Sequence, residues 1–464
     1  MNGIRLERLV LRNFKNISNG EIFFNEYKSL SRGVFDEEIF SNILGIYGQN
    51  GSGKTSAINA LKVIQYLLSG KPLPEKCLNY VKVGYNSFEI FSDFLITFGE
   101  LKLFVKYSVK LGKDENRYFI LEENLSSYNV IDKKDSETGF SFKKGKKISG
   151  KSVSNFNKDI KVIYDYIADI ESDSDKNDGK VISTIFNKKL IDLVSKDETG
   201  NDLYIKIIQE LQAFAVKKCL IYNMDYFKEN EDSGIKFRIT NEEGNIEDVI
   251  ASFDQSVFSY STFKAFKNTI DGINKVMPAI IPNYKIDIIS SNSEDVQKIT
   301  NKASFILVAK RKDEFPVPLI DESNGIKKII SLISGLLETF NNEGVLMAVD
   351  ELDSGVFEYL LGELVYTFAN FSKGQLIFTS HNLRALEKLN YKNIFFTTTN
   401  ENKAYTQLIN VRPSNNLRDL YYKCIANENF KTEDNFYDLI STEDLVAALA
   451  SEEEEDWARE CASS

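Results

Sequence analysis

The sequence predicts an α/β fold: a parallel sheet with crossover helices, an antiparallel β subdomain beside it, and a mostly helical insertion. Three observations favour this fold. Strand-like and helix-like segments alternate near both ends of the chain, which is typical of βαβ units. From residue 88 to residue 121, Phe, Ile, Val and Tyr recur with partial alternation, as in half-buried strands. From residue 126 to residue 300, Lys, Asp, Ser and Asn predominate between short helical pieces.

The N-terminal part is expected to form two strands and a helix before the β subdomain. Apolar residues favour a strand over residues 4–14 and a second, buried strand over residues 42–47 that ends in a glycine-rich turn. Residues 53–68 then carry apolar side chains at the spacing of one helix face: Ala57, Ile58, Leu61, Ile64 and Leu68. We assign residues 1–125 to the first part of the main α/β domain.

Residues 126–300 are expected to form a mostly helical insertion that serves assembly or partner docking. Helical pieces are predicted over residues 183–194 and 203–216. No sustained heptad repeat runs through the region, so long coiled-coil arms are not expected. Its acidic side chains have no strand-end context for a metal site and are expected to lie on a solvated face: Asp165, Asp169, Glu171 and Asp173.

The C-terminal part returns to βαβ alternation. After a hairpin over residues 305–320, elements are predicted over residues 325–340 (helix), 345–349 (strand), 355–370 (helix) and 375–379 (strand). Such alternation implies a parallel sheet with crossover helices. Residues 301–425 therefore complete the main domain, and residues 426–464 are expected to form a C-terminal helix and an acidic tail.

The composition is that of a globular protein without a membrane span. A chain of 464 residues favours two or three units, each able to bury its own core. No apolar run approaches the roughly 20 residues that a membrane helix needs. The first residues lack the apolar core of a signal peptide, so we expect a cytoplasmic protein. The cysteines form no CxxC pair, which argues against zinc and disulfides: Cys77, Cys219, Cys424 and Cys461.

The charge balance disfavours a protein that coats itself in nucleic acid, since the formal net charge is −11. The Lys-rich run at residues 143–151 is expected to be a solvated hairpin or loop, and contact with phosphate is the alternative. A nuclease with a His–metal site is not expected within this chain, because its single histidine has another predicted role, given below.

A glycine-rich segment follows the second strand. Gly48, Gly53, Lys54 and Thr55 fit the pattern GxxxxGK[ST] between a strand and a helix, which is the context that a phosphate-binding P-loop requires. Glycines let backbone N–H groups face the phosphates, Lys54 can reach the β and γ phosphates, and the Thr55 hydroxyl can bind Mg²⁺. A glycine-rich turn that opens an ordinary helix is the alternative. The expected nucleotide-binding residues are Gly48, Asn50, Gly51, Ser52, Gly53, Lys54, Thr55 and Ser56.

Two acids follow the strand predicted at residues 345–349. In VLMAVDELDSG, Asp350 and Glu351 lie where a parallel strand presents side chains to a ligand. Asp350 suits direct or water-mediated Mg²⁺ coordination, and Glu351 suits polarisation of the attacking water. Two acids after an apolar strand are common in isolation, and the accompanying P-loop is what favours a catalytic role.

The chain's single histidine, His381, follows the strand predicted at residues 375–379. A lone histidine is usually a satisfied structural residue. This one lies one βα unit past the two acids, so its imidazole can project to the same sheet edge and sense the γ phosphate. The sequence thus predicts a site built from three segments at one edge of a parallel sheet.

These motifs resemble those of the ABC-type ATPase superfamily at both ends of the chain. GQNGSGKT resembles Walker A, VLMAVDE resembles Walker B, Asp353 lies in a D-loop-like LDS, and His381 resembles the switch histidine. ESNGIKKIISL resembles a degenerate signature helix whose Ser323 and Gly325 face the nucleotide of a second copy; a capped helix start is the alternative. The usual LSGGQ is absent, and no Gln can be placed for the Q-loop. The resemblance implies an ABC-type P-loop ATPase head that binds and hydrolyses ATP with Mg²⁺ between two copies.

More narrowly, LRNFKN, DELDSG, TSHN and NLRDLYY resemble SMC- and OLD-like AAA family ATPases of bacterial anti-phage systems, in particular the ATPase subunits of abortive-infection and PARIS-type pairs (AbiL-like, AriA-like). That resemblance implies a homo-oligomer, of head-to-head dimers or higher order, that controls a separately encoded effector, often a nuclease. A phage trigger protein is a further implied partner. The same resemblance implies that Arg12, Phe14 and Lys15 lie near the nucleotide base and ribose. The alternative is that these residues serve strand-end packing and surface charge.

Two functions follow from these patterns. The first is a sensor ATPase of a defence system, in which slow hydrolysis controls an assembly and an effector encoded by a neighbouring gene. The second is a DNA-repair or chromosome-maintenance ATPase resembling SMC proteins, whose ATP-closed heads clamp DNA. The missing heptad arms disfavour the second, and whether DNA is bound stays open. The altered signature and the long insertion disfavour a transporter subunit.

Overall fold

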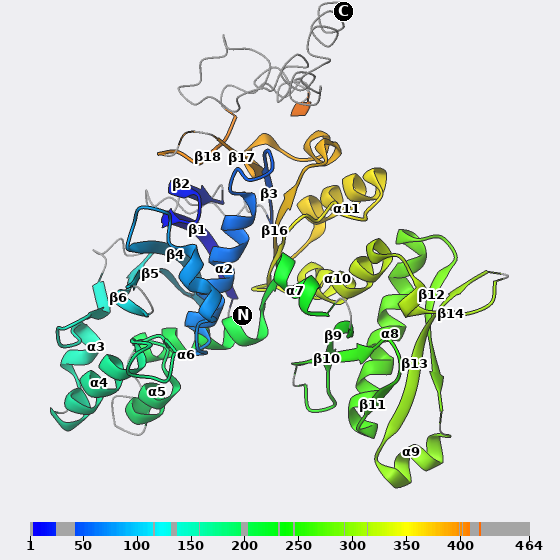
Figure 1. Cartoon of the computed structure of the whole chain (residues 1–464), viewed down its shortest axis with the longest axis horizontal. Helices are drawn as coiled ribbons and strands as arrows, with labels where there is room; N and C mark the ends of the chain where they lie inside the picture. The colour runs from blue at the N-terminus through cyan, green and yellow to red at the C-terminus, as the bar shows by residue number, and fades with distance from the viewer. Residues whose placement is uncertain are drawn as a thin grey trace, which may run out of the picture.

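The computed structural model shows two lobes with a long helix, α10 (Asn324–Asn341), between them (Figure 1). The larger lobe holds both six-stranded sheets, and the smaller one holds the region from residue 234 to residue 322. The structure describes residues 3–24, 42–114, 117–130, 137–156, 158–195, 203–230, 233–244, 246–291, 293–312, 314–398, 400, 402–408 and 417–418. The C-terminal helix and acidic tail expected over residues 426–464 lie outside these ranges.

The central sheet of the larger lobe is mainly parallel. In order across the sheet its strands are β18 (Tyr405–Thr406), β17 (Ile394–Thr397), β3 (Ile43–Tyr47), β16 (Gln375–Ser380), β15 (Leu346–Val349) and β8 (Cys219–Tyr222). Strands β17 to β8 run parallel, and β18 pairs antiparallel with β17 at one edge. Both faces are covered, which explains why these strands are continuously apolar. The predicted parallel sheet is confirmed, and β8 is an additional strand.

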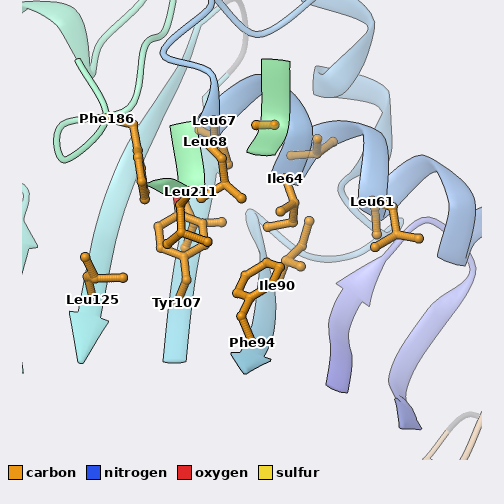
Figure 2. Packing of buried hydrophobic residues seen from close by; sticks show 14 of the residues in the cluster. Leu61, Ile64, Leu67, Leu68, Ile90, Phe94, Tyr107, Leu125, Phe186 and Leu211 are labelled. Carbon is orange, nitrogen blue, oxygen red and sulfur yellow. The ribbon is translucent and has the colours of Figure 1, made fainter. Parts of the chain in front are cut away.

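Helices cover both faces of the central sheet. Helix α2 (Lys54–Leu68) packs on one face, while α10 and α11 (Glu358–Phe371) pack on the other. Most of α2 is buried because the helix lies between two sheets. Figure 2 shows its Leu61, Ile64, Leu67 and Leu68 among side chains from the antiparallel strands, a loop and a further helix: Ile90, Phe94, Tyr107, Leu125, Phe186 and Leu211. All three helices lie where the apolar periodicity predicts them, with α11 beginning three residues later.

An antiparallel sheet lies against the far side of α2. Its strands, in order, are β2 (Ile17–Phe23), β1 (Gly3–Phe14), β4 (Ser87–Phe98), β5 (Leu101–Lys113), β6 (Tyr118–Asn129) and β7 (Glu137–Lys143). A 3-10 helix, η2 (Glu75–Tyr80), connects α2 to β4. This sheet is the β subdomain that the alternating aromatic and aliphatic residues predict. The boundary expected at residue 126 falls inside β6, so β6 and β7 extend the subdomain further along the chain.

Helices follow the antiparallel sheet along the chain. They are α3 (Lys151–Ser154), α4 (Lys158–Glu171), α5 (Lys188–Ser195) and α6 (Leu203–Lys217). The helical pieces predicted over residues 183–194 and 203–216 correspond to α5 and α6. Helix α6 leads directly into β8, so the chain returns to the central sheet in the middle of the region expected to be an insertion.

The smaller lobe mixes helices and strands. Helix α7 (Met224–Asn230) follows β8 and precedes this lobe. The elements of the lobe are β9 (Gly234–Thr240), β10 (Ile246–Ser252), β11 (Ser256–Phe258), α8 (Tyr260–Ile280), β12 (Tyr284–Ser290), α9 (Glu294–Thr300), β13 (Ala303–Arg311), β14 (Val317–Pro318) and η4 (Leu319–Asp321). Strands β9 and β10 form a ribbon, and β13 pairs with β11, β12 and β14. The β13–β14 pair is the predicted hairpin. Residues 126–300 thus contain more strand than expected. The sequence did not predict these strands because they are short and partly polar and show little apolar periodicity.

Helix α10 belongs to two apolar cores. Leu332 and Leu336 pack with the central sheet and α11, whereas Ile329, Ile330 and Ile333 pack with α8 and the strands of the smaller lobe. The helical repeat places these two sets on adjacent faces of one helix. Helix α10 therefore joins the two lobes through its own buried side chains. Beyond α11 and β16, two 3-10 helices complete the fold, η5 (Leu383–Glu387) and η6 (Tyr391–Asn393).

Two acids of the middle region do not lie on a solvated face, contrary to the prediction. Glu171 is 4% exposed and Asp173 is 1% exposed. Glu171 accepts hydrogen bonds from Asn187 and Lys189, and Asp173 accepts one from Lys144. These donors compensate the burial of the two carboxylates. Among the described residues, no group of three or more His, Cys, Asp or Glu side chains could hold a metal ion.

The Lys-rich run at residues 143–151 is paired with acids. Its ion pairs join Lys143 to Glu122, Lys144 to Asp173 and Lys151 to Glu137.

In the described part of the chain, no helix is both long and apolar enough to cross a membrane. Cys77 and Cys219 are buried free thiols, and burial raises the pKa of each to about 12. Cys424 and Cys461 lie outside the described residues.

Glu123 on β6 is a fully buried carboxylate that ties the antiparallel sheet to the loop between α4 and α5. It accepts hydrogen bonds from the Tyr107 hydroxyl at 2.5 Å and the Ser183 hydroxyl at 2.6 Å. The Thr184 N–H and hydroxyl both donate to it at 2.7 Å. All four of these groups donate to the Glu123 carboxylate. If the carboxylate were removed, the four buried donors would lose their shared acceptor.

Replacing Glu123 by Gln should lower the free energy of unfolding by about 2–4 kcal/mol, because the amide N–H groups would face donors. Urea unfolding followed by circular dichroism measures this. The matched control is Glu122→Gln, whose carboxylate forms an exposed ion pair with Lys143 and should cost less than about 1 kcal/mol. Equal losses in the two variants would contradict the role assigned to Glu123.

Candidate nucleotide-binding site

The parallel strands of the central sheet end at one common edge. Tyr47 of β3 lies opposite Ser380 of β16, and Val349 of β15 lies opposite both Phe378 of β16 and Tyr222 of β8. The residues that follow these strands are therefore neighbours in space. They are Gly48, His381, Asp350 and Asn223. The register thus brings together the three segments that the sequence predicts, and it adds a fourth from β8.

The P-loop has a backbone that glycine alone tolerates at its first position. Gly48 has a φ of 153°. A Cβ added there would lie 1.7 Å from the Thr397 hydroxyl oxygen, which is an impossible contact. Gly53 has a φ of 108° directly before α2, in the left-handed region that disfavours other residues. These two glycines let the loop turn tightly so that the N-terminus of α2 opens toward a ligand.

Lys54 is folded back over the P-loop. Its Nζ donates to the carbonyl oxygens of Gly48 and Gln49, each at 2.7 Å. Burial lowers the pKa of Lys54 to about 8, while the nearby carboxylates of Asp350 and Glu351 act in the opposite direction. An amine held at the mouth of the loop can transfer its hydrogen bonds to a phosphate.

Side chains that the sequence analysis missed brace the P-loop. Asn16 donates from Nδ2 to the Gly51 carbonyl at 2.6 Å, and its Oδ1 accepts from the Ser56 hydroxyl at 3.0 Å. Tyr405 donates to the Gly53 carbonyl at 2.8 Å. The Thr397 hydroxyl contacts the Ser52 hydroxyl at 2.6 Å. Asn16 follows the first strand within LRNFKN, but its contact with the loop depends on how the two sheets pack. Asn50 lies exposed at the loop tip.

Asp350 and Thr55 supply oxygen ligands of the kind that Mg²⁺ prefers. Asp350 is fully buried, and its Oδ1 accepts from the Thr379 hydroxyl at 2.6 Å and lies 3.3 Å from the Thr55 hydroxyl. Its Oδ2 is buried and has no hydrogen-bond partner within the described residues. A buried carboxylate oxygen without a donor is costly unless a cation or water completes it. The residues present therefore fit a magnesium ion held by Thr55, Asp350 and nucleotide phosphate.

Glu351 has an unusual backbone for a residue with a side chain. Its φ is 51°, in the left-handed region. The Thr379 hydroxyl oxygen accepts its N–H at 2.7 Å, so the same threonine contacts both acids. Strained backbone of this kind persists where the surroundings hold it, and it often occurs at active sites. The arrangement sets the start of the Glu351 side chain next to Asp350.

Asp353 and His381 are connected. The Asp353 Oδ2 accepts the backbone N–H groups of His381 and Asn382, each at 3.0 Å. Partial burial lowers the pKa of His381, and the Lys54 cation lowers it further. Gly48 and His381 follow the paired residues Tyr47 and Ser380, so the histidine lies beside the P-loop. The D-loop-like turn, the histidine and the P-loop are thus gathered around one site.

The three residues expected near the base and ribose have different surroundings. Phe14 is fully buried against Tyr80 and Phe88, which favours the alternative of strand-end packing; its place near the base and ribose stays a prediction. Arg12 is exposed and pairs with Glu89 at 3.5 Å. Burial lowers the pKa of Lys15, while Asp225 and Asp350 act in the opposite direction, and its amine lies 4.9 Å from the centre of the Tyr80 ring.

The expected signature residues begin α10. The Ser323 hydroxyl accepts the Ile326 N–H at 3.3 Å, so Ser323 caps the helix. A Cβ added to Gly325 would lie 2.9 Å from the Gly355 carbonyl oxygen, so the helix start touches the turn after Glu351.

On the other side of Asp350, Asn223 donates to Asn59 of α2 at 3.1 Å and to Asp225 at 3.2 Å. No sequence pattern marked Asn223, because β8 itself was not predicted.

Replacing Lys54 by Ala should weaken ATP binding at least about 100-fold, because the cation at the mouth of the loop would be lost. Titration of a fluorescent ATP analogue measures this. The matched control is Lys62→Ala on the same helix, where Nζ contacts the Gln65 side chain at 2.9 Å, and it should leave affinity unchanged. Retained binding in the Lys54 variant would refute the P-loop assignment.

ATP affinity should fall as the pH rises above about 8, the lowered pKa of Lys54 in the nucleotide-free protein. Below that pH the ammonium is present; above it, binding must take up a proton, because a neighbouring phosphate favours the charged form. The dissociation constant should then rise by up to about tenfold per pH unit, as isothermal titration calorimetry can measure. Lys54→Arg keeps its charge and should lack this dependence. If ATP affinity fell in the same way in Lys54→Arg, the pH dependence would belong to another titrating group.

Comparison with known proteins agrees with this geometry. A family model described as "AAA domain, putative AbiEii toxin, Type IV TA system" matches residues 43–387, well over half of the chain. No curated protein matches the chain. A Pyrococcus furiosus Smc head bound to the C-terminal domain of ScpA is 13% identical, covering 87% of this chain and 96% of its own, with a TM-score of 0.41.

Two other solved structures share this level of similarity. The SMC head of Thermotoga maritima is 13% identical over 87% of this chain and 99% of its own, with a TM-score of 0.38. The recombination mediator RecF with ATP is 14% identical over 88% of this chain and 100% of its own, with a TM-score of 0.37. The motifs, the sheet order and the family match together indicate a P-loop domain of AAA type. The chain belongs to the AAA-domain family described as putative AbiEii toxin of type IV toxin–antitoxin systems.

Proposed function

We propose that the chain is an ATP-binding and ATP-hydrolysing sensor or scaffold subunit of a bacterial anti-phage (abortive infection) system. The observation that carries the ATPase part is the convergence of Lys54, Asp350, Glu351 and His381 at one edge of the central sheet. The family description, which names a toxin–antitoxin system, supports the defence part.

The described residues can divide the chemistry among them. Lys54 and the N-terminus of α2 would hold the phosphates. Thr55 and Asp350 would hold Mg²⁺, which when bound neutralises charge on the phosphate oxygens. Glu351 would accept a proton from the attacking water or orient it, and His381 would sense the γ phosphate. The Asp353 carboxylate would hold the backbone of His381 and Asn382 next to the turn that follows Glu351.

Assembly into a homo-oligomer is the second part of the proposal. Ser323 and Gly325 lie at the exposed start of α10, where a second copy could place its nucleotide. Heads would then close on ATP as dimers or higher oligomers. Residues 126–300 would serve assembly or docking of an effector, such as a nuclease encoded by a neighbouring gene, and a phage trigger protein would change that assembly. Slow hydrolysis suits such control.

Replacing Glu351 by Gln should leave ATP binding intact and lower turnover by about 10²–10⁴-fold, because the general base is lost. Magnesium-dependent phosphate release measures turnover, and mass photometry in ATP measures assembly. The variant should accumulate as ATP-bound oligomers. The matched control is Glu358→Gln, an exposed acid in the first turn of α11, which should behave like the wild type.

A Glu351→Gln protein that stays monomeric in ATP would sink the assembly proposal. Turnover equal to that of the wild type would remove Glu351 from the reaction. ATP hydrolysis that DNA stimulates, with a steep dependence on salt, would favour the alternative of a DNA-clamping repair or chromosome-maintenance ATPase. Co-purification of the adjacent gene's product in ATP would instead support the effector partnership.

A further inference from the structure

A lysine of α10 binds the backbone of the proposed catalytic glutamate within the same chain. The Lys328 Nζ donates to the Glu351 carbonyl oxygen at 2.5 Å. Its amine also lies over the Phe227 ring, 5.0 Å from the ring centre. Burial lowers the pKa of Lys328, while the carboxylates of Glu351 and Asp353 act in the opposite direction. These contacts fix the lysine against one carbonyl group.

That carbonyl belongs to the residue whose backbone is strained. Glu351 keeps a φ of 51° while its N–H is bound to Thr379 and its C=O is bound to Lys328. Thr379 belongs to β16 of the rigid central sheet, whereas Lys328 belongs to α10. The direction of the Glu351 side chain therefore depends on the position of α10 relative to the sheet.

The start of α10 also touches the turn that follows Glu351. A Cβ added to Gly355 would lie 2.4 Å from the Gly325 Cα, and one added to Gly325 would lie 2.9 Å from the Gly355 carbonyl oxygen. The two backbones are thus in direct contact and cannot shift independently. The same helix is buried in both lobes, as Figure 1 shows by its place between them. A movement of the smaller lobe or of the helix start would reach Lys328.

We propose that Lys328 is a positioning residue that couples α10 to Glu351. In this view, contact of the Ser323–Gly325 end with a second copy's nucleotide shifts α10, and Lys328 carries that shift to the Glu351 backbone. Hydrolysis then becomes sensitive to assembly. The inference rests on the proposed ATPase function, but the hydrogen bond and the glycine contact that carry it are independent of any nucleotide.

The test compares three variants of the full chain. Lys328→Met keeps the length of the side chain and removes the donor, so kcat should fall about tenfold or more while KM for ATP changes less than about threefold. Lys328→Arg retains an N–H donor and should restore most of kcat. The matched control is Lys327→Met: that lysine, one residue earlier, donates to the Ile320 carbonyl at 2.6 Å, away from Glu351. It should match the wild type.

Several results would overturn the proposal. They are a Lys328→Met protein with unchanged kcat, a loss that lies in KM, an equal loss in Lys327→Met, and a Lys328→Arg protein as slow as Lys328→Met. A loss confined to kcat in Lys328→Met and rescued by Arg supports it, because a purely structural role would affect both lysines or both kinetic constants.

A second measurement needs no ATP hydrolysis and separates this inference from the proposed function. Within the turn, the Leu352 N–H binds the Thr379 carbonyl at 2.9 Å and the Ser354 N–H binds the Glu351 carbonyl at 3.0 Å. Without nucleotide, amide hydrogen exchange at these positions should be at least about threefold faster in Lys328→Met and unchanged in Lys327→Met. A wild type without ATPase activity would sink the proposed function alone. Unchanged exchange in Lys328→Met would sink the coupling.

Discussion

The site depends on the hydrogen-bonded register of four parallel strands. Because β3, β16, β15 and β8 end together, the residues that follow them meet at one edge of the sheet. A slip of one residue in any strand would turn its following side chain to the opposite face and remove it from the site. Thr379 shows how close the fit is: its hydroxyl bonds both the Asp350 carboxylate and the Glu351 N–H. Sheet pairing thus determines the chemistry more than any loop does.

The edge so formed concentrates charge that the protein alone does not balance. The Asp350 Oδ2 and the Asp353 Oδ1 are buried without hydrogen-bond partners among the described residues. The Lys54 amine donates hydrogen bonds to two carbonyl groups of its own loop. The Asp350 oxygen would coordinate a magnesium ion, and the lysine would donate its hydrogen bonds to a phosphate instead. A bound magnesium ion and a phosphate would therefore offset the cost of burying these charged groups.

Helix α10 connects this edge to the rest of the molecule. Leucines on one side of it pack against the central sheet, and isoleucines on the adjacent side pack in the smaller lobe. Its first turn touches the turn after Glu351, through two glycines that leave no room for a side chain. A shift of a helix with two buried faces changes its packing against both lobes. This is the physical basis of the proposed link between hydrolysis and assembly.

The sequence determined the P-loop, the acid pair and the histidine with their order, since each needs specific residue types beside an apolar strand. It also determined most of the helices and the two large sheets, because long amphipathic or continuously apolar segments carry a strong periodic signal. It missed β8, which has only four residues, and most strands of the smaller lobe, which are short and partly polar.

Tertiary packing alone decided the rest. The resemblance implies that Phe14 lies near the base and ribose, and the pairing of β1 with β4 buries its side chain beside Phe88. Asn16, Tyr405 and Asn223 support the site from segments far apart in the chain, and no local pattern marks them. Lys328 differs from Lys327 in nothing that the sequence shows. Their roles diverge because successive residues on a helix point about 100° apart, and one of those directions meets the Glu351 carbonyl.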